Sequence, residues 1–100
     1  MTEKQFTDAF TAAGGWFILT QYEAIADWRG SRADLVDYIY TLGFDAKRTG
    51  SNTRVSSVLR LIEEDAIKEA IIKIRDSKAI NRQHPEAYRL AVEILKRRFS

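Results

Sequence analysis

The sequence predicts an all-α fold, a single helical domain over residues 1–100 built from five or six short helices. Apolar residues recur at spacings of three and four along most of the chain, as they do on one face of a helix. N-cap residues and glycines divide these stretches into short segments. With 100 residues, 45% of them hydrophobic, the chain can build one core, and it has no internal repeat or linker that would divide it.

The first two helices are separated by a pair of glycines. Thr2 can cap the first helix, with Gln5 at the capping-box position, and Gly14-Gly15 ends it. The aromatic segment 16–22 comes next, and its secondary structure has two interpretations. A short strand is one, because glycines precede the segment. We favour a helix because residues 23–28 continue with helix formers.

The third helix, over residues 31–42, has a signal at each end. Ser31 is a good N-cap, with Asp34 at the capping-box position, and Gly43 is a good C′ residue. Phe44 follows the glycine, where an apolar residue often packs back onto the helix end. The expected inward face comprises Leu35, Val36, Ile39 and Leu42.

A fourth helix is expected over residues 53–64, capped by Ser51 or Asn52. The expected inward face comprises Val55, Val58, Leu59 and Ile62. A break near Asp65 is predicted because acids are unfavourable at the negative end of a helix dipole. A fifth helix then ends near residue 76, although one long bent helix over residues 53–76 remains an alternative.

The last helix follows a polar connection over residues 78–83. Pro85 suits the first turn of a helix, and the segment ends in the basic residues 96–98. The expected inward face comprises Tyr88, Ala91, Val92, Leu95 and Phe99.

Positive charge is concentrated in two segments. Residues 46–62 carry four Lys or Arg and no acid, and residues 77–100 carry six against two. The first segment also leads into a predicted helix N-terminus, whose free amides and partial positive charge favour anions. Gly50 and the small residues after it would let a phosphate approach the backbone. A P-loop is absent, so a phosphate of a polymer is favoured over a free nucleotide.

We therefore predict a small non-enzymatic protein that binds nucleic acid, with DNA favoured over RNA, through the basic loop 46–52 and the exposed face of helix 53–64. The candidate contacts are Lys47, Arg48, Ser51, Asn52, Thr53, Arg54, Ser57, Arg60, Lys96, Arg97 and Arg98. The pair of helices at residues 31–64 resembles that of helix-turn-helix DNA-binding domains over about a third of the chain. Its connection, Gly43–Asn52, is about ten residues long, against three or four in the standard turn.

A second hypothesis is a protein-interaction module, such as a regulatory or inhibitory subunit, with a homodimer as one version. Trp16, Trp28, Tyr38 and Tyr40 are too many large aromatics for so small a core to bury fully. Aromatic side chains are enriched at interface hot spots, so an aromatic helical face could bind a partner. The basic segments could equally meet an acidic protein.

Metal, cofactor and membrane functions find little support. The chain has no cysteine and a single histidine, His84, so zinc ligands are missing. Residues 45–56 match the length of a calcium-binding EF-hand loop but place Lys47 and Ser56 at ligand positions. No apolar run reaches the roughly 18 residues of a membrane span. We expect no metal, no cofactor, no membrane partner and a cytoplasmic location, which the lack of cysteine fits.

Overall fold

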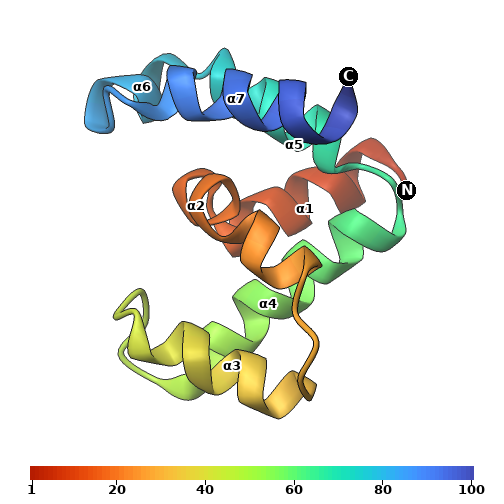
Figure 1. The fold of residues 1–100 in the computed structure, drawn as a ribbon, viewed down its shortest axis with the longest axis vertical. Coiled ribbons are helices and arrows are strands. Elements are labelled where there is room, and N and C mark those ends of the chain that lie inside the picture. The colour runs from red at the N-terminus through yellow and green to blue at the C-terminus, as the bar shows by residue number, and fades with distance from the viewer.

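The computed structural model describes residues 1–100 and contains seven helices and no strand. The helices are α1 Glu3–Ala13, α2 Gly15–Ala26, α3 Arg32–Thr41, α4 Arg48–Glu63, α5 Ile67–Arg75, α6 Lys78–Gln83 and α7 Ala87–Phe99. In Figure 1, α5, α6 and α7 lie at one end of the molecule and α3 at the other. Helix α2 contacts α5 and α7 at the first end and α4 in the middle, and α4 in turn carries α3. The predicted all-α class and single domain are confirmed.

Local end signals position the first three helices as predicted. The Thr2 hydroxyl accepts from the Gln5 amide at 3.1 Å, and the Gln5 side chain accepts from the Thr2 amide at 2.9 Å. The Ser31 hydroxyl caps α3 by accepting from the Asp34 amide at 3.1 Å. Gly43, after the end of α3, has a φ of +84°, which a glycine adopts without strain. The ambiguous segment 16–22 is helical.

The segment 78–83, predicted as a polar connection, is a short helix, and this raises the number of helices to seven. The Ser77 hydroxyl caps it by accepting from the Ile80 amide at 3.2 Å. The Asn81 side-chain amide donates to the carbonyls of Ile74, Arg75 and Ser77, at 3.2, 3.1 and 2.7 Å. These bonds tie α6 to the last turn of α5, where helix carbonyls lack a following turn, so polar residues here stabilise a helical turn.

Residues 53–76 form two helices, and the first begins earlier than predicted. The break lies at Asp65, whose φ is +56°, between the end of α4 and the start of α5. The Ala66 amide donates to the Leu61 carbonyl at 2.8 Å and closes the end of α4. Helix α4 starts at Arg48, so most of the predicted basic loop 46–52 is helical.

The core contains 21 buried apolar residues, and α2 buries Phe17, Ile18, Leu19, Tyr22 and Ile25. Two predicted inward faces are rotated. Leu61 of α4 is fully buried, whereas Leu59 and Ile62 are half-buried. Helix α7 buries Ala87, Ala91 and Ile94, while Tyr88 is 57% exposed. None of the seven helices combines the length and apolar character needed to cross a bilayer.

Candidate nucleic-acid interface

Helices α3 and α4 pack against each other across an ordered connection over residues 42–47. Phe44 packs edge-on against Phe17 of α2, with the ring centroids 5.0 Å apart. The Tyr40 hydroxyl donates to the Ala46 carbonyl at 3.3 Å. The connection over residues 42–47 is shorter than the ten residues predicted, because α4 begins at Arg48. It is nearer to the length of a standard helix-turn-helix turn.

The position predicted for a bound phosphate is occupied by the carboxylate of Asp45. This carboxylate accepts from the Ser51 hydroxyl at 3.1 Å and from Nε of Arg54 at 3.0 and 3.1 Å. A Cβ added to Gly50 would lie 2.9 Å from Oδ1 of Asp45. The glycine therefore lets the Asp45 carboxylate, in place of a phosphate, approach the backbone. The protein's own anion thus neutralises the start of α4.

Two of the predicted contacts serve the fold instead. Ser51 is fully buried, so the prediction that it contacts nucleic acid is wrong. Arg54 lies half-buried and donates from Nη1 to the Ala13 carbonyl at 2.5 Å. Its guanidinium also lies 5.5 Å from the ring centroid of Phe17 and 5.7 Å from that of Phe44. Arg54 therefore links α1, α2 and the connection to α4, and its side chain is only 25% exposed.

The outer face of α4 remains open and carries small polar side chains. Thr49, Asn52 and Thr53 are exposed, and Ser56 and Ser57 are half-buried. The hydroxyls of Thr53, Ser56 and Ser57 donate to carbonyls one turn earlier, at 3.1, 2.7 and 2.9 Å. These side chains therefore lie close against the helix backbone, so this face of α4 stays low. No acid occurs in α4 before Glu63.

Cations border this face. Arg48, with its side chain 49% exposed, donates from Nε to Asp37 at 2.6 Å and from Nη2 to the Ala33 carbonyl at 3.2 Å. Arg60 is exposed and lines a hollow between α1 and α4 of about 280 Å³. Lys47 is exposed at the N-cap of α4.

Arg32 of α3, absent from the predicted set, belongs to the same border because its Nη2 donates to the Ser56 hydroxyl. The Ser31 cap signal placed Arg32 in the first turn of α3. Only the packing of α3 on α4 brings it over the outer face of α4.

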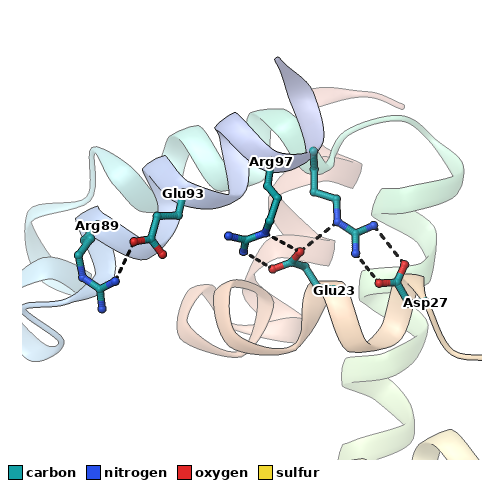
Figure 2. A network of polar contacts seen from close by, with 6 residues as sticks. Glu23, Asp27, Arg89, Glu93 and Arg97 are labelled. Atoms are coloured by element: carbon teal, nitrogen blue, oxygen red, sulfur yellow. Dashed lines mark hydrogen bonds and ion pairs between the residues drawn. The ribbon is translucent and has the colours of Figure 1, made fainter.

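The C-terminal cations lie elsewhere. Arg97 and Arg98 of α7 bind Glu23 of α2 and Asp27, the C-cap residue of α2, as Figure 2 shows for the labelled residues. Nε of Arg97 lies 3.1 Å from Glu23 Oε2, and Nη1 of Arg98 lies 3.1 Å from Asp27 Oδ1. Lys96 lies at a separate hollow between α5 and α7. The structure therefore does not join the two predicted basic segments into one surface.

This cluster gives stability a pH dependence. The hydrogen bonds from Arg97, and then those from Arg98, hold the pKa of Glu23 below its ordinary value. A carboxylate whose folded-state pKa is lowered stabilises the fold fully above its unfolded pKa, about 4.3, and this contribution is lost as pH falls through the folded-state pKa.

We expect Glu23→Gln to lower the melting temperature at pH 6, and we expect its difference from the parent to shrink as pH falls from 5 towards 3. Thermal unfolding across this range measures it, with Glu86→Gln, an exposed acid in no ion pair, as the control. A difference that stays constant from pH 6 to 3 would contradict the assignment.

The aromatic residues of the second hypothesis do not share one face. Trp16 stacks on His84 with centroids 3.8 Å apart, whereas Trp28 stacks on Tyr38 at 5.6 Å. Tyr38 and Tyr40 are each 40% exposed, but neighbours two apart in a helix point about 200° away from each other. The predicted aromatic docking face is thus dispersed over several elements.

Comparison of the chain with protein-family models, with curated proteins and with solved structures finds no match. A function is therefore proposed from the residues and contacts above alone.

Proposed function

We propose that the protein binds nucleic acid, with DNA favoured over RNA, through the outer face of α4 and the adjoining start of α3. The observation that carries this proposal is a helical face that has no acid of its own before Glu63 and is bordered by exposed cations, with Asp8 of α1 and Asp37 of α3 beside it. The revised contacts are Arg32, Lys47, Arg48, Asn52, Thr53 and Arg60, with Ser57 at the margin. The protein's role in this proposal is binding, without catalysis.

The border cations would contact phosphates, which supply most of the affinity in non-specific complexes. Arg48 can do so without leaving Asp37, because a guanidinium has five N–H donors and its two intramolecular bonds use only part of them. Asn52 and Thr53 lie between the cations, where polar side chains can reach base edges. The 16 residues of α4 span about 24 Å, enough to follow a major groove.

Fluorescence anisotropy with a 20-base-pair duplex and the matching single strand, at 50 and 200 mM salt, tests this proposal. We expect duplex binding that weakens with salt. The triple variant Arg32→Gln, Arg48→Gln and Arg60→Gln should reduce the slope of log K against log salt by about 2 to 3, since each lost phosphate contact contributes about 0.9.

The control removes three cations from the other end of the molecule, through Arg75→Gln, Arg82→Gln and Arg89→Gln. These residues lie on α5, α6 and α7, and the last is paired with Glu93 at 2.8 Å (Figure 2). The control should leave the slope within about 1 of the parent value. If both triple variants lower the slope equally, net charge alone explains the binding and the proposed face has no special role. Binding that does not change with salt would refute the proposal.

A further inference from the structure

Helix α7 carries more apolar surface than the fold covers. Its buried residues are Ala87, Ala91 and Ile94. A second stripe, spaced at four, three and four residues, runs along the neighbouring face and comprises Tyr88, Val92, Leu95 and Phe99. Tyr88 is 57% exposed and the other three are half-buried. Leu95 and Phe99 pack with one side against the core, and Phe99 stacks on Tyr22 of α2 with the ring centroids 6.1 Å apart. The sequence pattern assigns the whole stripe to a core, yet its outer side stays partly exposed.

All of the stripe except Tyr88 forms one wall of a groove between α5 and α7. Ile72 of α5 lies opposite Val92, Leu95 and Phe99, and the hollow between them has a volume of about 290 Å³. Cations rim both walls. Lys68 on α5 and Lys96 on α7 are exposed and form no ion pair, whereas Arg75 is bound to Asp76 at 2.9 Å. The groove is thus apolar at its floor and positive at its edges.

We propose that this groove binds an acidic amphipathic helix of a partner protein. An apolar floor takes the hydrophobic side of such a helix, with anchors at i, i+3 or i+4, and i+7. Lys68 and Lys96 stand on opposite walls, so carboxylates on both flanks of the helix would each meet a free ammonium group. This site lies on helices other than α3 and α4, so it is independent of the proposed nucleic-acid interface.

The stripe also sets the length of the occupant. Within the groove, Val92 and Phe99 are seven residues apart, which in a helix corresponds to about 10 Å, or two turns. A partner helix of two to three turns would cover this part of the stripe. A hollow of about 290 Å³ is small beside the broad complementary surface that a folded domain needs.

Two other occupants, a second copy of the chain and a lipid bilayer, fit this groove less well. A second copy docked by the same face would bring its own Lys68 and Lys96 against these lysines, because a two-fold interface pairs one patch with itself. Like charges brought together in this way are costly. A bilayer would meet a concave apolar floor rather than a protruding apolar face, which membrane insertion requires.

The test uses two 16-residue peptides with leucines at helical spacing and either glutamates or lysines on both flanks. Fluorescence anisotropy should show the glutamate peptide binding the protein at least tenfold tighter than the lysine peptide. Double reversal through Lys68→Glu and Lys96→Glu should invert this preference. The matched control, Arg29→Glu with Arg82→Glu, changes the net charge equally at exposed positions outside the groove and should keep the parent preference.

Several outcomes would overturn the proposal. They are absence of binding, equal binding of the two peptides, and loss of preference in both double variants. Binding to phosphatidylserine vesicles but not to peptide would assign the groove to a membrane. A dimer in sedimentation that the Lys68 and Lys96 reversal alters would assign it to a second copy. The Arg32, Arg48 and Arg60 triple variant should still bind the glutamate peptide, so failure of one interface is distinguishable from failure of the other.

Discussion

Replacement of Asp45 by alanine is expected to lower the free energy of unfolding by about 3 kcal/mol, because it leaves a half-buried arginine without its carboxylate. Asp45 is only 14% exposed at its side chain and holds Nε of Arg54 at 3.0 Å. The substitution also removes the acceptor of the fully buried Ser51 hydroxyl. An unsatisfied buried donor adds its own desolvation cost. Urea unfolding followed by circular dichroism measures the loss.

Asp37→Ala is the matched control, since it breaks an aspartate–arginine pair of similar length on the surface. Asp37 is 62% exposed at its side chain and binds Arg48 at 2.6 Å. Exposed pairs contribute at most about 1 kcal/mol, so the control should unfold at nearly the parent urea concentration. A loss for Asp45→Ala no larger than that for Asp37→Ala would show that Asp45 has no special role at the start of α4.

The features that the sequence predicted well depend on neighbours in the chain. The caps at Thr2 and Ser31 bond residues three positions away, and Gly43 adopts a conformation that its own lack of a Cβ permits. The break at Asp65 follows from acids at a helix end. Such signals are complete within a few residues, so no tertiary information is needed to interpret them.

The predicted phosphate site was misjudged because charge in a sequence does not reveal pairing. Arg54 was counted as a free cation, yet its carboxylate lies nine residues earlier and its second acceptor, the Ala13 carbonyl, lies 41 residues away. Arg97 and Arg98 meet their acids across more than 70 residues. Only the folded chain shows which of its cations remain free.

The inward face of α7 illustrates a second limit. Its apolar residues cover a wide arc, so periodicity alone fits either the stripe containing Val92 and Leu95 or the one containing Ala91 and Ile94. Packing on α5 and α2 buries the second. The residual stripe is the basis of the proposed groove, and the sequence could not distinguish it from core.

Phe17→Ala is expected to have the largest effect on stability, a loss of about 4 kcal/mol, because it empties a fully buried aromatic position. Phe17 is 1% exposed and packs edge-on against Phe44. The guanidinium of Arg54 lies 5.5 Å from its ring centroid, so the cavity would also remove a cation–π contact. Urea unfolding measures the loss, and Tyr38→Ala, at a 40% exposed aromatic, should cost far less.

The two substitutions should not be additive, because Phe17 and Asp45 both hold the same guanidinium of Arg54 in place. Once the ring is gone, Arg54 can move towards solvent, and the later loss of its carboxylate then costs less. We expect the double variant Phe17→Ala with Asp45→Ala to lose at least 0.5 kcal/mol less than the sum of the single losses, the size of coupling found between residues that share a partner. If the losses simply add, Arg54 does not couple the two sites, and its assignment to the fold instead of the nucleic-acid interface would be in error.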